Sequence, residues 1–223
     1  MTHPLGAVRL GLRLAPLSLA LADAPDSAWS FAPLQGLTDG QAGAALAQML
    51  SARGLDGARL DAGSPYAMPD CALAHGAKYA AGAAFAELAS WFANAERAVA
   101  KARQRFAARG IDAPPARCWP HHFDLATLAA FPGADGATAY VGAGLSPGDH
   151  YYAEPYFYVS LYPPPAIADL TALPAIGHWR DHEFTAAIAP AHAILAAADR
   201  AAAVEAFLSR AIDSAIGRLA GRG

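Results

Sequence analysis

The chain has 223 residues, of which 55% are hydrophobic and 16% charged, and its formal net charge at pH 7 is −3. This length suits one well-buried domain, and the apolar content excludes a disordered chain. A net negative charge argues against nucleic acid as a partner, because phosphate binding requires a concentrated positive field. No apolar run reaches the roughly 18 residues that a membrane helix requires, so we expect no membrane span.

The N-terminal part of the chain, residues 7–35, predicts short strands. Leucines recur at every second position in residues 10–14 and 17–21, as expected of half-buried strands. The apolar run 14–22 follows two arginines, which resembles the layout of a signal peptide, but Pro16 interrupts the run. We therefore favour the strand interpretation.

Cysteine usage indicates the compartment. The chain has two cysteines, Cys71 and Cys118, which are too few for a disulfide scaffold and lack the spacing of a zinc knuckle. A cytoplasmic location is therefore expected. Cys118 is interpreted as an ordinary buried thiol rather than a nucleophile, because no feature of the sequence indicates a lowered thiol pKa.

Helices are expected where apolar residues recur at intervals of three and four. The first spans residues 39–53 and follows a capping residue, Thr38. The second, at 82–109, carries the longest apolar stripe of the chain. The last spans 200–219 and is capped by Asp199.

Strands are expected at residues 116–128, 137–145 and 154–162, which are rich in aromatic and β-branched residues. Short turns join these segments, so they should form an antiparallel meander, with a further strand at 184–188. We predict a single α+β domain over residues 1–223. Its antiparallel sheet should carry the long central helix and the C-terminal helix on one face.

The polar residues that could form a site begin with the stretch Cys-Trp-Pro-His-His-Phe-Asp at residues 118–124. If residues 118–127 form a regular strand, alternate side chains point to opposite faces, with Trp119 and Phe123 toward the core and Cys118 away from it. The strand at 154–162 alternates in the same way. Five polar residues should then share the other sheet face: His122, Asp124, Glu154, Tyr156 and Tyr158.

These five residues suit two kinds of chemistry. His122, Asp124 and Glu154 offer nitrogen and oxygen ligands for a divalent metal, either zinc, iron or manganese. The same imidazole and carboxylates, with the phenols of Tyr156 and Tyr158, could carry out general acid–base catalysis. We hypothesise a small-molecule enzyme, with a divalent metal as one option. The alternative is a non-catalytic ligand-binding or interaction protein in which these residues form a structural hydrogen-bond network.

Alternation also gives the two adjacent histidines different roles. His121 should face the core with Trp119 and Phe123, so its replacement should reduce stability. His122 should lie among carboxylates and contribute to binding. Outside this stretch, Asp149 is interpreted as a turn residue, and residues 177–179 and 181–183 as a solvated loop.

Four motifs together resemble a family of uncharacterised bacterial proteins. They are the stretch 118–124, Gly-Leu-Ser-Pro-Gly-Asp at 144–149, Glu-Pro-Tyr-Phe-Tyr-Val at 154–159, and Gly-His-Trp at 177–179. The likeness runs from about Trp29 to Leu195 and implies no activity. In that family a further histidine usually follows Gly-His-Trp, where this chain has Arg180. The resemblance therefore implies that a ligand set including that histidine would be incomplete here.

Overall fold

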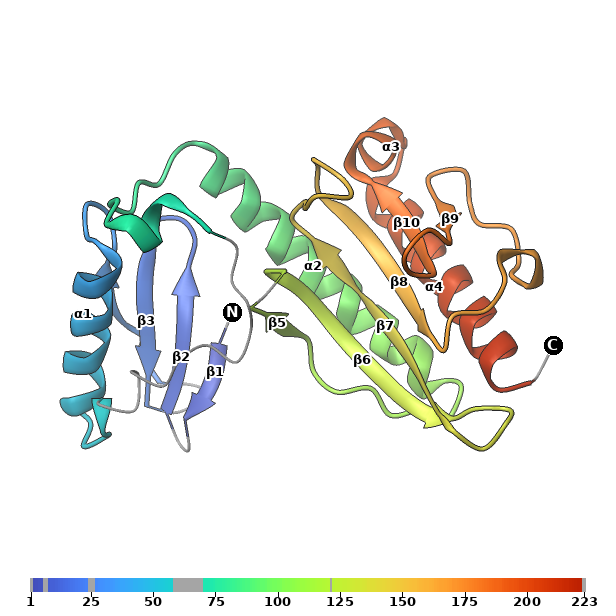
Figure 1. The fold of residues 1–223 in the computed structure, drawn as a ribbon, viewed down its shortest axis with the longest axis horizontal. Helices are drawn as coiled ribbons and strands as arrows, with labels where there is room; N and C mark the ends of the chain where they lie inside the picture. The colour runs from blue at the N-terminus through green and yellow to red at the C-terminus, as the bar shows by residue number, and fades with distance from the viewer. Residues whose placement is uncertain (1, 6–7, 24–26, 58–69, 121, 222–223) are drawn as a thin grey trace. The chain divides into compact units, whose positions relative to one another are not determined.

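The structure of the chain, a computed structural model, describes residues 2–5, 8–23, 27–57, 70–120 and 122–221. The chain divides into two compact units, Met1–Ser90 and Trp91–Gly223. Each unit has its own antiparallel sheet (Figure 1). The prediction of a single domain is not tested by this division and stays a prediction. Among the helices of the described residues, none combines the length and the hydropathy that crossing a membrane requires.

The first unit pairs a four-stranded sheet with helix α1 (Asp39–Ser51). The strands follow chain order: β1 (Thr2–Leu5), β2 (Val8–Arg13), β3 (Ser18–Ala22) and β4 (Ser30–Pro33). Leu21 of β3 and Leu50 of α1 are buried together with Val8. The expected strands are confirmed, as is the capping box in which the Thr38 side chain accepts a hydrogen bond from the backbone of Gln41. A 3-10 turn, η2 (Ala72–His75), follows α1 in the chain.

The second unit is built on a six-stranded sheet in the order β5-β6-β7-β8-β10-β9, in which all neighbours are antiparallel. The strands are β5 (Arg117–Trp119), β6 (Asp124–Pro132), β7 (Thr138–Ser146), β8 (Tyr156–Tyr162), β9 (His178–Arg180) and β10 (Ala186–Pro190). The turn η3 (Ile167–Asp169) and the short helix α3 (Ala191–Ala196) complete this part. The predicted meander is confirmed in β6, β7 and β8.

Helices α2 (Ala84–Ala107) and α4 (Arg200–Leu219) pack on one face of this sheet, as predicted (Figure 1). Phe106 of α2 and Phe207 of α4 are fully buried, and replacing either one by alanine would cost about 3–5 kcal/mol of stability. The two helices are also joined by charge, because Asp213 of α4 forms ion pairs with Arg105 and Arg109 near the end of α2.

Alternation along the strands separates two faces of the six-stranded sheet. The face toward the helices is apolar and buried, with Leu125, Val141, Leu145, Phe157 and Val159. The opposite face carries Tyr140 of β7 and Tyr156, Tyr158 and Tyr162 of β8, and we call it the tyrosine face. Asp124 also lies on this face, because its neighbour Leu125 is in register with Leu145 on the helix side.

Candidate functional site

The tyrosine face is centred on a hydrogen bond from the Tyr158 phenol to the Asp124 carboxylate. Tyr158 belongs to β8 and Asp124 to β6, so the phenol reaches across β7, which lies between them. Gly142 of β7 lies beside the ring, and a Cβ there would be 3.8 Å from Tyr158 Cε2 and 2.5 Å from Ser160 Oγ. A larger residue at Gly142 would therefore clash with Ser160 and crowd the Tyr158 ring.

Burial sets the protonation of Tyr158. Asp124 is 8% exposed. Burial raises the pKa of Tyr158 well above its ordinary value, and the charge and hydrogen bond of Asp124 raise it further. The phenol therefore keeps its proton at neutral pH and acts as a donor to the carboxylate.

A second tyrosine–aspartate pair lies beside the first. The Tyr156 phenol donates to Asp149 Oδ2 at 2.7 Å, and the rings of Tyr156 and Tyr158 are 6.2 Å apart. Asp149 Oδ1 accepts hydrogen bonds from the backbone N–H groups of Tyr151 (2.8 Å) and Tyr152 (3.1 Å). Asp149 thus fixes the loop before β8 as well as the Tyr156 phenol. Sequence reasoning found the turn but missed the bond to Tyr156.

At the β9 edge, aromatic rings enclose Arg180. Its guanidinium carbon lies 4.5 Å from the ring centre of Tyr151, 4.9 Å from that of Phe184 and 5.9 Å from that of Tyr152. Nη2 donates to Glu183 Oε2 at 3.1 Å. The Nε atom is buried and has no hydrogen-bond partner in the part of the chain that the structure describes.

His178 completes this edge. Its Nε2 lies 3.1 Å from the Tyr152 phenol. Burial lowers the pKa of His178, and the charge of Arg180 lowers it further, so the imidazole is neutral at pH 7. The prediction of a loop is wrong for His178 and Trp179, which belong to the edge strand β9. The alternation of Trp179 between two polar residues is the sequence signal that could have indicated it.

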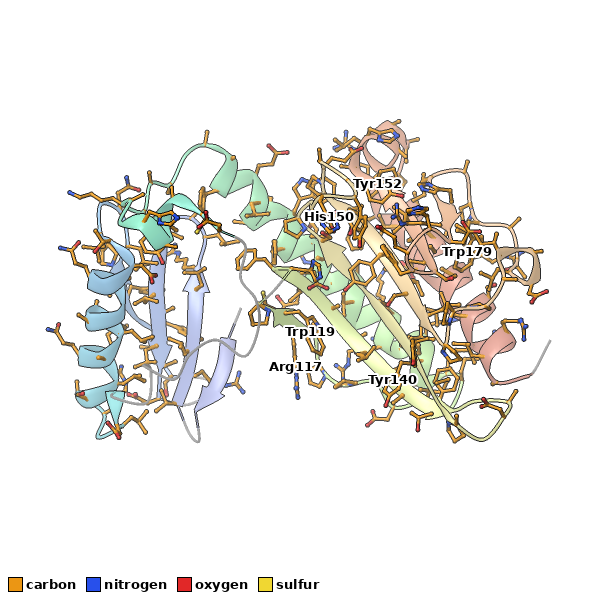
Figure 2. The ribbon with its side chains drawn as sticks, in the orientation of Figure 1. Arg117, Trp119, Tyr140, His150, Tyr152 and Trp179 are labelled. Carbon is orange, nitrogen blue, oxygen red and sulfur yellow. The ribbon has the colours of Figure 1, made fainter. Side chains whose placement is uncertain are left out.

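Figure 2 shows Tyr152 and His150 at the end of the sheet next to α3, and Tyr140 at its other end.

Three of the five predicted site residues come together, namely Asp124, Tyr156 and Tyr158. Glu154 lies before β8 and binds His192 instead, accepting from its backbone N–H at 2.8 Å and contacting its Nδ1 at 2.6 Å. These contacts lower the pKa of Glu154. His122 is exposed in the turn between β5 and β6. The catalytic roles assigned to these residues stay predictions.

The metal-ligand prediction requires His122, Asp124 and Glu154 to converge. Within the described ranges, no group of three or more histidine, cysteine, aspartate or glutamate side chains forms that could hold a metal ion. Glu154 is engaged by His192 in this arrangement. The metal-ligand set stays a prediction that this geometry does not support.

The prediction of one strand over residues 116–128 is wrong. The chain reverses between Trp119 and Asp124, which pair with each other across β5 and β6, and the Phe123 N–H donates to the Trp119 carbonyl at 2.7 Å. Pro120 lies at the break, where its missing N–H cannot join a ladder. Register then places Trp119 on the side of Asp124, and Cys118 on the side of Leu125, so the predicted facing of Trp119 and Cys118 is inverted.

Three further predictions concern residues in or next to this turn. The core-facing role of His121 lies outside the described residues. Phe123 contacts Phe92 of α2, with ring centres 5.6 Å apart, as its predicted core orientation requires. For Cys118, burial raises the thiol pKa to about 11, with the charge of Asp124 adding to the effect. The thiol is therefore protonated at neutral pH, and its interpretation as an unreactive buried cysteine is supported.

Comparison of the sequence with models of protein families, with curated proteins and with solved structures finds no match. The resemblance to a bacterial family therefore stays a prediction. Any functional interpretation rests on the chemistry of the tyrosine face itself.

Proposed function

We propose that the protein binds a small molecule on the tyrosine face, over the Asp124–Tyr158 pair. The observation that carries this proposal is the burial of a carboxylate and a phenol on the sheet face opposite the helices. Removing a carboxylate from water is costly, and an apolar pair of similar volume would often be neutral or stabilising. A polar pair in this position suits recognition of a polar ligand.

Backbone strain supports the same location. Phe123, which precedes Asp124, has a φ of +55°, and Glu183, which binds Arg180, has a φ of +67°. Residues other than glycine rarely adopt this region, and such strain, of order 1–3 kcal/mol each, is concentrated at functional sites. Both strained positions adjoin side chains of the tyrosine face.

An enzyme that uses Asp124 as a general base is the second candidate. It is favoured by the protonated phenol of Tyr158, which holds the Asp124 carboxylate in a fixed orientation while a ligand proton is transferred to it. Cys118 is not assigned a role in this chemistry, because its thiol pKa of about 11 leaves little thiolate at neutral pH.

A panel of small molecules in matched pairs tests the proposal. Each carboxylate, such as benzoate or succinate, is compared with its neutral amide in calorimetric titrations of the whole chain. At least one compound should bind saturably, and its affinity should fall about 10-fold or more in Tyr158→Phe, because Asp124 loses the donor that orients it. Tyr162→Phe, which alters a 63% exposed tyrosine four residues along the same strand from Tyr158, is the matched control and should lose much less affinity than Tyr158→Phe.

The outcomes separate the two candidate functions. If no compound binds, or if both tyrosine variants bind like the wild type, the tyrosine face is not the site. If a bound compound is converted to a product, and Asp124→Asn retains binding but loses turnover, the protein is an enzyme. Binding without conversion supports the non-catalytic function.

A further inference from the structure

Arg180 combines a fixed orientation with an unsatisfied donor. Its side chain is 17% exposed, and its Nε is buried without a hydrogen-bond partner among the described residues. An unsatisfied buried donor is rare in native proteins and is commonly explained by an ion, ligand or water that completes it. Arg180 therefore points to a group that is supplied from outside the described chain.

We propose that Arg180 is the anion-binding residue of the tyrosine face, and that the ligand carries a carboxylate or phosphate group. This inference rests on the proposed function and specifies the chemical class of its ligand. A planar guanidinium offers donors in a fixed fork, which matches two oxygens of one anionic group. Such an anion would satisfy Nε, which the protein leaves without an acceptor.

The surroundings of Arg180 favour this role. The rings of Tyr151 and Phe184 lie within 5 Å of the guanidinium carbon and hold its plane, so little orientational freedom is lost on binding. Glu183 contacts Nη2 alone, and its side chain is 51% exposed, so this ion pair offsets the positive charge weakly. His178, the other titratable group on β9, is neutral at pH 7 and does not compete for the anion.

Register relates Arg180 to the centre of the face. Arg180 is in register with Ala186 of β10, which is in register with Ser160 of β8, beside Tyr158. Two strand spacings, about 10 Å, separate β9 from β8, and four spacings, about 19 Å, separate β9 from β6, which carries Asp124. A ligand that contacts both Arg180 and the Asp124–Tyr158 pair is therefore elongated, with the anionic group at one end and a hydrogen-bonding group at the other. Inorganic phosphate is too small to make both contacts.

The test follows the side-chain Nε–Hε signals of arginine by nitrogen-15 NMR in the whole chain. The signal of Arg180 is assigned by its loss in Arg180→Lys, which keeps the positive charge but not the fork. Benzoate, succinate and inorganic phosphate are the anionic probes, and benzamide and succinamide are the neutral probes. We expect the Arg180 signal to shift saturably with a carboxylate or with phosphate, and not with the amides.

The variant adds a quantitative expectation. Arg180→Lys should bind the anionic probe about 10-fold or more weakly, the size expected for losing charge-assisted hydrogen bonds. Arg218→Lys is the matched control, because Arg218 also pairs with a carboxylate, that of Asp169. This variant should leave the affinity for the anionic probe unchanged. The comparison of each acid with its amide uses the wild-type protein and does not depend on the folding of any variant.

Each outcome has one meaning. The inference is overturned if the amides bind as tightly as the acids, or if Arg180→Lys binds like the wild type. If an amide binds and loses affinity in Tyr158→Phe, the proposed function stands while the anion assignment fails. If no probe binds, both are rejected. A response to phosphate but not to carboxylates identifies the anionic group as phosphate.

Discussion

Tyr158 on β8 donates its phenol proton to Asp124 on β6, across the intervening strand β7. Residues 34 positions apart in the chain are thereby joined on the sheet face opposite the helices. The contact requires that β7 carry no side chain beneath the Tyr158 ring, and Gly142 and Gly144 meet this requirement. This relationship has consequences for stability, for pH dependence and for ligand binding.

Removing the phenol oxygen in Tyr158→Phe should lower the free energy of unfolding by about 1–3 kcal/mol, because the buried carboxylate of Asp124 loses a donor. Urea denaturation measures the change. In Tyr162→Phe the loss should stay within about 0.5 kcal/mol, since that ring is largely exposed. Equal losses in the two variants would show that the Asp124 contact adds nothing to stability.

The raised pKa values of Tyr156 and Tyr158 predict a loss of stability in alkali. Burial raises both above the ordinary value of 10.0, so the unfolded chain releases these protons first as the pH rises. The stabilising contribution is complete below about pH 10 and is lost above it, at up to about 1.4 kcal/mol per pH unit for each tyrosine. The free energy of unfolding of a Tyr156→Phe/Tyr158→Phe variant should fall less steeply between pH 10 and pH 11. Parallel curves for variant and wild type would contradict the raised values.

Gly144→Ala should destabilise the second unit. An added Cβ would lie 2.5 Å from the Leu125 carbonyl oxygen and 2.5 Å from Ala126 Cβ, and this backbone cannot move freely. We expect a loss of about 1–3 kcal/mol by urea denaturation. Gly43→Ala is the contrasting control, because Gly43 lies in α1 with nothing within 4 Å of its added Cβ. That variant should gain about 0.5–1 kcal/mol from helix propensity. A neutral Gly144→Ala would mean that β6 and β7 are less closely packed.

Glu154 should titrate below its ordinary value of 4.5, because His192 donates hydrogen bonds to its carboxylate. A lowered pKa stabilises the fold above about pH 4.5, and this contribution is lost as the pH falls through the folded value. Carbon-13 NMR of the carboxyl group measures it directly. In His192→Ala the pKa should move back toward 4.5, whereas in His182→Ala, which alters an 82% exposed histidine, it should not move. An unchanged value in His192→Ala would assign the shift to another cause.

The helices and the central meander could be predicted because their signals are local. An apolar stripe with a capping residue indicates a helix without reference to the rest of the chain, and α4 begins at the predicted residue after Asp199, whose side chain accepts from Ala202 N–H at 3.0 Å. Alternation likewise assigned Tyr156, Tyr158 and Asp124 to one face, because each lies in a regular strand.

The rest of the site depends on contacts between distant residues. Alternation fails across the reversal at Pro120, so Trp119 and Cys118 were assigned to the wrong faces. The partner of Glu154, His192, is 38 residues away, and no periodicity connects the two. The enclosure of Arg180 brings an edge strand together with a loop that precedes β8, and this arrangement arises only when the sheet forms.

The most direct test of small-molecule binding on the tyrosine face is a map of backbone NMR shifts for the wild-type chain saturated with the tightest-binding compound of the panel. The largest shifts should fall on Tyr158, Ser160 and Ile188, whose side chains share that face. Shifts confined to the outer surfaces of α2 and α4, around Lys101 and Glu205, would contradict the proposal and move the site to the other side of the sheet.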